Sequence, residues 1–137
     1  MSRPTILDTS SLIGLQHLGI LPDIVRLYEP AVIPEAVRDE FGESLPDGLG
    51  VLPLSPSGEA LARLLSATLG RGESEAIALA VERDALRIVL DDRRARASAR
   101  ELSLPVTGTL ALVVRACDAG LLHDVSSALD TLDDAGF

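Results

Sequence analysis

Two short apolar segments of the sequence end on aspartate and are followed by residues that favour a helix. The first reads TILDTSS, in which Asp8 follows the apolar residues, and the second reads RIVLDDRR, which ends on Asp91 and Asp92. If both segments are strands of a parallel sheet, these carboxylates lie at its carboxyl edge, where open α/β folds bind ligands. The alternative is that each aspartate only caps the helix after it, since Asp, Ser and Thr are preferred N-cap residues.

A third acidic residue, Glu73, stands near the start of a predicted helix in GRGESEAIALA. Helical spacing places Glu73 on one stripe with Ala76 and Ala80, so that it extends the side of the helix that faces the core. Glu75 points about 200° away from Glu73 and is the weaker candidate. The alternative role for an acid in this position is a favourable interaction with the helix dipole.

The fourth candidate is Glu40 in IPEAVRDEF, beside an apolar side that Val37 and Phe41 mark. Taken alone, Glu40 fits a surface position better than a site. The candidates together form a carboxylate cluster without histidine, which suits a hard cation such as Mg²⁺ or Mn²⁺. Such an ion activates a water and neutralises a scissile phosphate. The predicted ligands are Asp8, Glu40, Glu73 and Asp91 or Asp92.

A basic stripe starts directly after the second pair of aspartates. Arg93, Arg96 and Arg100 recur at i, i+3 and i+7 of a predicted helix, and arginine suits bidentate contacts with phosphate. The alternative is a solvated face whose arginines pair with neighbouring acids. After the first aspartate, Thr9 and Ser10 are candidates to hydrogen-bond a ligand water or that aspartate, with helix capping as their alternative role.

Composition limits the classes of function. The 137-residue chain has a net charge of −9, and all 12 of its basic residues are arginine. The lack of lysine excludes Schiff-base chemistry and phosphate binding through a P-loop lysine. The negative charge opposes unaided binding of nucleic acid, unless cations bridge the carboxylates and the phosphates. One cysteine, Cys117, excludes an intramolecular disulfide and fits a reducing compartment. Without a signal peptide or an apolar run of ~18 residues, we expect a soluble, cytoplasmic protein.

Apolar runs alternate with helical patterns along the chain, which predicts an α/β fold with a parallel sheet in a single domain of residues 1–137. Because only 2% of the residues are aromatic, the core must consist of Leu, Val, Ile and Ala. We expect strands at 5–7, 31–33, 51–54, 86–92 and 104–108, with 51–54 at an edge because it contains Pro53. Helices are expected at 10–18, 21–28, 34–41, 57–69, 73–84, 93–102, 109–119 and 123–134.

The sequence resembles PIN-domain ribonucleases, typified by the VapC-like toxins of bacterial and archaeal toxin–antitoxin systems. The resemblance rests on the ordered segments ILDTSSLIGL, VIPEAVRDE, GRGESEAIALA, IVLDDRRAR and LPVTGTLALVVRACDAGLL. It is closest to a PIN-like subgroup that has mostly been described as a domain of unknown function. The resemblance implies a three-layer α/β/α sandwich with a short, mostly parallel sheet of four or five strands, and an acidic pocket that binds Mg²⁺ or Mn²⁺ and cleaves RNA.

By position, the four family acids match Asp8, Glu40, Glu73 and one of Asp91 and Asp92, of which Asp91 is favoured because it directly ends the strand. Glutamate replaces the usual aspartate at the third acid, and the Thr or Ser that typically precedes the fourth acid is missing. The resemblance also implies a homodimer that a small antitoxin protein holds in check.

The main hypothesis is therefore a metal-dependent endoribonuclease that acts as the toxin of a toxin–antitoxin pair. The alternative is a non-catalytic PIN-like module that retains the acidic pocket but acts in protein binding or assembly, which an acidic surface without lysine suits as well. A phosphotransfer domain is disfavoured because Ser10, and not a second aspartate, stands two residues after Asp8.

Overall fold

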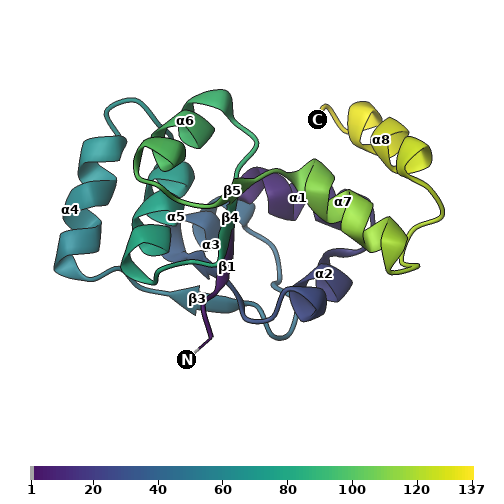
Figure 1. Ribbon diagram of the computed structural model, residues 1–137, viewed down its shortest axis with the longest axis horizontal. Coiled ribbons are helices and arrows are strands. Elements are labelled where there is room, and N and C mark those ends of the chain that lie inside the picture. The colour runs from purple at the N-terminus through teal and green to yellow at the C-terminus, as the bar shows by residue number, and fades with distance from the viewer. Residues whose placement is uncertain (1) are drawn as a thin grey trace.

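The computed structural model describes residues 2–137, in which five strands and eight helices follow one another along the chain (Figure 1). Strands and helices alternate as expected for an α/β fold. In chain order the elements are β1 (Thr5–Leu7), α1 (Thr9–His17), α2 (Leu21–Leu27), β2 (Ala31–Pro34), α3 (Glu35–Phe41), β3 (Gly50–Leu52), α4 (Pro56–Leu65), α5 (Arg71–Glu82), β4 (Arg87–Val89), α6 (Arg93–Glu101), β5 (Val106–Thr107), α7 (Thr109–Asp118) and α8 (Val125–Asp134).

The five strands form one parallel sheet in the order β3-β2-β1-β4-β5. Ile6 of the central strand β1 pairs with Val32 of β2 on one side and with Ile88 of β4 on the other. The chain runs from β1 outward to β3 and then crosses back to β4, so the strand order reverses between β1 and β4. The carboxyl ends of these two strands therefore flank the crevice in which open α/β folds bind ligands.

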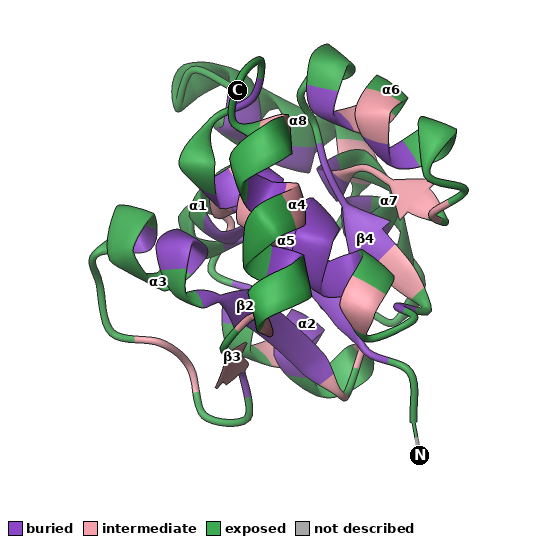
Figure 2. Ribbon diagram, turned by 90° about the vertical axis from the view of Figure 1, so that its left-hand side faces the viewer, coloured by how far each residue is buried: buried purple, intermediate pink, exposed green. Residues whose placement is uncertain are grey.

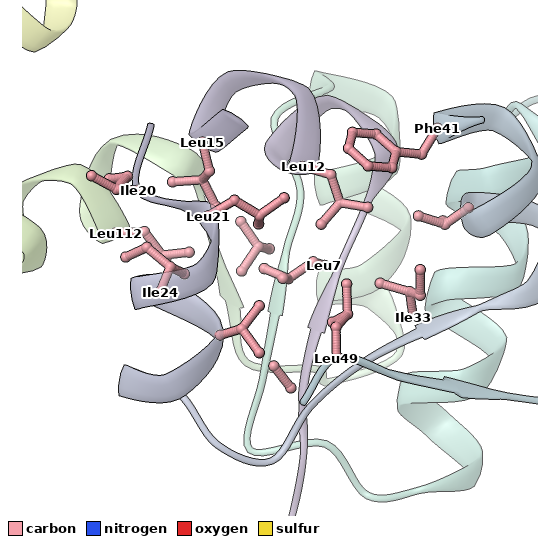
Figure 3. Close-up of a cluster of buried hydrophobic side chains, with 14 of the residues drawn as sticks. Leu7, Leu12, Leu15, Ile20, Leu21, Ile24, Ile33, Phe41, Leu49 and Leu112 are labelled. Carbon is pink, nitrogen blue, oxygen red and sulfur yellow. The ribbon is translucent and has the colours of Figure 1, made fainter. Parts of the chain in front are cut away.

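Helices cover both faces of the sheet, which confirms the predicted three-layer α/β/α fold. Leu7 and Ile33 lie on one face with side chains from α1, α2, α3 and α7, and Figure 3 shows this cluster around Leu7 and Leu12. Ile6 lies on the opposite face with residues of α5 and α6. Because both faces are covered, consecutive residues of the central strands are apolar, as in Ile6-Leu7 of β1 and Ile88-Val89 of β4. Figure 2 shows the buried sheet, with α4 largely exposed outside α5.

Several element boundaries differ from the sequence prediction. Helix α5 begins at Arg71 and not at Glu73, because Gly70 adopts the extended N-cap conformation. Pro34 ends β2 and caps α3 from an extended backbone conformation, so it is not the first helical residue. The predicted edge strand ends before Pro53, which cannot donate to a ladder. The helix predicted from 123 begins at Val125.

Helix α8 packs against α7 and α1 through a small third cluster of Val113, Ala128 and Leu132. In the same region the ring of Phe137 approaches Gly14 of α1 so closely that a Cβ there would lie 2.7 Å from the ring. Within residues 2–137, each helix is too short or too polar to span a bilayer.

Candidate functional site

Asp8 follows β1 and is 2% exposed, at the point where the strand order reverses. Its Oδ1 accepts a hydrogen bond from the Ser11 N–H at 2.8 Å, so Asp8 is the N-cap of α1, as the capping alternative predicted. Within residues 2–137, its Oδ2 accepts no hydrogen bond. Asp8 also lines a cavity of about 160 Å³ with Thr9, Ser10, Gly70 and Gly72. Capping and a position in a cavity thus coincide at this residue.

Glu40 lines the same cavity and is fixed from two sides. Its Oε1 accepts a hydrogen bond from the Thr9 hydroxyl at 2.6 Å, and its Oε2 accepts one from the Gly72 N–H at 3.1 Å. These two donors come from the first turns of α1 and α5. The Glu40 carboxylate lies so close to Gly72 that a Cβ at position 72 would be 2.1 Å from Glu40 Oε1. This position of the Glu40 side chain, in the cavity wall, therefore requires glycine at position 72.

Glu73 is the third acidic residue in the cavity wall. It occupies the third position of α5, where its Oε1 accepts a hydrogen bond from the Gly70 N–H at 3.3 Å. Ala76, Ile77 and Ala80 on its stripe are fully buried, as predicted. Glu75 lies outside this cavity, and its Oε1 accepts a hydrogen bond from the Ala36 N–H at 3.1 Å.

Asp91 and Asp92 follow β4 and make different contacts. Both Asp91 oxygens accept hydrogen bonds from Thr109, one from its N–H at 2.9 Å and one from its hydroxyl. Asp91 thereby ties the end of β4 to the start of α7. Asp92 is the N-cap of α6 and accepts a hydrogen bond from the Ala95 N–H at 3.0 Å. The charge of Asp91 acts on Asp8, and that of Asp92 acts on Glu73.

Repulsion among these carboxylates acts on the two that are least solvated. The pKa of Asp8 is raised to about 7, chiefly by burial and in smaller part by the charges of Asp91 and Glu73, while hydrogen bonds from Ser11 oppose the shift. Burial also raises the pKa of Glu73, with smaller contributions from the charges of Asp92 and Glu40. Three of the five predicted acids thus line one cavity, and the charges of the other two act on Asp8 and Glu73.

Comparison with known proteins agrees with this fold. A family model described as a PIN domain matches residues 4–137. This chain belongs to the PIN-domain family. A solved structure of a PilT N-terminus domain protein from the hyperthermophilic archaeon Sulfolobus solfataricus P2 has a similar fold, with a TM-score of 0.58 and 22% identity. The alignment covers 82% of this chain and 92% of the archaeal chain. The search of curated proteins finds no significant match.

PIN domains generally have nuclease activity and use divalent metal ions. The donor set of this PIN domain suits such an ion, because it consists of carboxylates around a buried Asp8 whose Oδ2 is free. However, no three acidic, histidine or cysteine side chains within residues 2–137 lie close enough together to hold an ion as they stand. Within residues 2–137, the Glu73 carboxylate is held by one hydrogen bond of 3.3 Å, from the Gly70 N–H.

The predicted arginine stripe of the PIN domain lies directly beside these acids. Arg93, Arg96 and Arg100 line a cavity of about 290 Å³ together with Asp91. Arg93 and Arg100 are exposed, as the alternative of a solvated face expects, but within residues 2–137 none of the three arginines lies within 4.0 Å of a carboxylate. One guanidinium N–H of Arg96 is already used, because it donates to the Leu90 carbonyl at 2.8 Å.

Sequence reasoning missed two residues that position the acids. One is Gly72, whose signal in the sequence is a glycine inside a helical pattern, which indicates a close approach of another group. The contact of Thr109 with Asp91 spans 18 residues of sequence and has no local signal. The two histidines, His17 and His123, line a separate cavity near α8.

Proposed function

We propose that residues 1–137 form a single PIN domain that acts in the cytoplasm as an endoribonuclease dependent on Mg²⁺ or Mn²⁺. The observation that carries this proposal is the convergence of acids from β1, α3, α5 and β4 around the buried Asp8. Their mutual repulsion is relieved by a cation, and oxygen ligands are those that hard divalent ions prefer.

In this proposal Asp8, Glu40, Glu73 and Asp91 hold the ion, with Asp92 as a neighbouring ligand. A bound ion supplies a water of lowered pKa and charge neutralisation at the scissile phosphodiester. Thr9 acts by orienting Glu40, to which it donates. Ser10 is exposed at the mouth of the cavity, where it meets the substrate.

The arginines of α6 provide the path of the RNA backbone into the site. Arg93 and Arg100 are exposed, and guanidinium groups suit bidentate phosphate contacts. They offset the net charge of −9 locally. We further propose that the protein is the toxin of a toxin–antitoxin pair and forms a homodimer. The cognate small antitoxin would insert an arginine into the acidic cavity, which offers unshared carboxylate charge.

The decisive experiment is calorimetric titration of Mn²⁺ and Mg²⁺ into the wild type, Asp8→Asn and Asp124→Asn, followed by RNA cleavage assays on the same samples. Asp124 is a matched control, because it caps α8 through the Ser127 N–H in the same way but is fully exposed. Asparagine also caps helices well, so both variants should fold. We expect Asp8→Asn alone to lose ion binding and cleavage.

A wild type that binds neither ion and behaves like both variants would contradict the proposal. The non-catalytic module would then be the better interpretation. One observation favours it: the oxygens of Glu40 and Asp91 already accept hydrogen bonds from the protein. A carboxylate has about four acceptor positions, however, so these bonds leave room for an ion.

A further inference from the structure

A second polar cavity shares the first turns of α5 with the acidic site. Gly72 and Glu73 line the acidic cavity, whereas Ser74 and Glu75 line the second one, together with residues of α3 and α4. The volume of the second cavity is about 370 Å³, within the range of small-molecule sites. Only the start of α5 therefore separates this cavity from an RNA strand that crosses the acidic site.

The floor of this cavity contains a buried polar atom without a partner. Ser74 is 1% exposed, and within residues 2–137 its Oγ is the one buried side-chain nitrogen or oxygen that makes no hydrogen bond. Ser66, in the wall of the same cavity, donates its hydroxyl to the Arg63 carbonyl at 2.7 Å. An unsatisfied buried hydroxyl is costly. Its place in a cavity wall points to a ligand that supplies the missing hydrogen bond.

The charged side chains around Ser74 are only partly paired. Arg71 lies 3.6 Å from a Glu75 oxygen, and the other Glu75 oxygen accepts a hydrogen bond from the backbone. Arg63, Glu59 and Glu35 also line the cavity, and none of them has an ion-pair partner within 4.0 Å among residues 2–137. A complementary ligand must offer N–H donors to the free carboxylates and a phosphate or a flat π surface to the guanidinium group.

We propose that this cavity binds a guanine base of the RNA strand, next to the acidic site; this inference rests on the proposed ribonuclease function. Guanine carries two N–H donors side by side on its Watson–Crick edge, which one carboxylate accepts as a pair. Adenine and cytosine offer one amino group beside an acceptor, and uracil offers one N–H between two acceptors. The carboxylates of Glu35 and Glu59 therefore select guanine over the other bases.

The remaining groups of the cavity fit the rest of a guanine nucleotide. Arginine planes stack on bases or bind the flanking phosphate, and Arg63 is available for either contact. The Ser74 hydroxyl donates to or accepts from the buried part of the base. Single-stranded RNA is read by such pockets because its bases are free to turn out of the strand.

The test is titration of 5′-GMP and 5′-UMP into ¹⁵N-labelled protein without divalent ions. GMP should shift amide signals of α4 and of the first turns of α5 and bind about tenfold more tightly than UMP, the effect of losing one good hydrogen-bonded pair. Glu59→Gln should abolish this preference, while Glu43→Gln, an exposed control outside the cavity, should preserve it. Equal binding of the two nucleotides, or no binding of either, would overturn the inference.

Ser74→Ala separates a ligand contact from a structural role. Removal of an unpartnered buried hydroxyl should leave the melting temperature unchanged or raise it, while GMP affinity falls about tenfold. Ser66→Ala, which removes a hydroxyl that is already satisfied, should leave GMP affinity unchanged. A lower melting temperature of Ser74→Ala with unchanged GMP affinity would show a structural role and overturn the inference.

Cleavage assays distinguish failure of this inference from failure of the proposed function. Short single-stranded RNAs in which one guanine is moved along the sequence should be cut at a fixed distance from that guanine. In Glu59→Gln the position of the cut should no longer depend on the position of the guanine. Wild-type cleavage without GMP binding or guanine preference overturns the cavity assignment and leaves the ribonuclease. GMP binding by a chain that cleaves no RNA supports the guanine site and overturns the ribonuclease.

Discussion

The burial of Asp8 predicts that the folded chain loses stability as the pH rises when no divalent ion is present. Its pKa is raised from 3.8 to about 7, chiefly because burial removes the carboxylate from water. The folded state therefore holds the proton more tightly than the unfolded chain does. The contribution of protonated Asp8 to stability is complete below pH 4 and is lost as the pH rises through about 7.

The size of the loss in folding free energy follows from the shift in the pKa of Asp8. At roughly 1.4 kcal/mol per pKa unit, ionisation of Asp8 removes about 4 kcal/mol of folding free energy between pH 4 and pH values above 7. This is a large part of the ~5–15 kcal/mol that stabilises a typical domain. The raised pKa of Glu73 acts in the same direction. Asp8→Asn retains a side-chain oxygen that can accept from Ser11 and has no proton to lose.

Urea denaturation of the wild type, Asp8→Asn and Asp124→Asn at pH 5 and pH 8, in EDTA, measures the effect. We expect the wild type and Asp124→Asn to lose about 3 kcal/mol more than Asp8→Asn between these two pH values. Mn²⁺ at 100 times its dissociation constant should then restore about 2.7 kcal/mol at pH 8, except in Asp8→Asn. Identical pH profiles for the three proteins would refute the reasoning about Asp8.

Two further predictions concern the residues that hold the acids in place. Gly72→Ala should displace the Glu40 carboxylate, because a Cβ at position 72 would lie 2.1 Å from Glu40 Oε1, and should weaken Mn²⁺ binding at least tenfold in calorimetry. Gly70→Ala is the control. Its Cβ would lie 3.5 Å from the nearest side-chain atom, so this variant should bind Mn²⁺ as the wild type does. Thr109→Val should lower the urea-unfolding free energy by about 2 kcal/mol, since it removes a buried hydroxyl that donates to the Asp91 carboxylate; unchanged stability would contradict a structural role for this bond.

The sequence predicted the fold because its strongest signals are periodic and agree with one another. Apolar runs that end on Asp8 and Asp91 are strands covered on both faces, and the helical patterns between them require a parallel sheet. The meeting of those aspartates at one sheet edge then follows from topology alone. Even so, the start of α5 was misplaced, because Gly70 caps it without a side chain that could signal a cap.

Contacts between distant segments could not be predicted. The bond from Thr9 to Glu40 spans 31 residues, and the one from Thr109 to Asp91 spans 18. Each depends on how α3 or α7 packs against the sheet, which no local propensity encodes. Glu40 illustrates the consequence: it is exposed, as its sequence context favoured, but only the packing of α1, α3 and α5 brings its carboxylate to the cavity.

Capping does not account for Asp8 by itself, although Asp8 does cap α1. An N-cap contributes about 1 kcal/mol, whereas the shift in its pKa corresponds to a cost of about 4 kcal/mol for the ionised form. A serine would provide the cap without a buried charge. Asp124 caps α8 at the surface, and its hydrogen bonds with Ser127 lower its pKa. A carboxylate that is costly where it stands, with other acids around it, is one that a bound cation would stabilise.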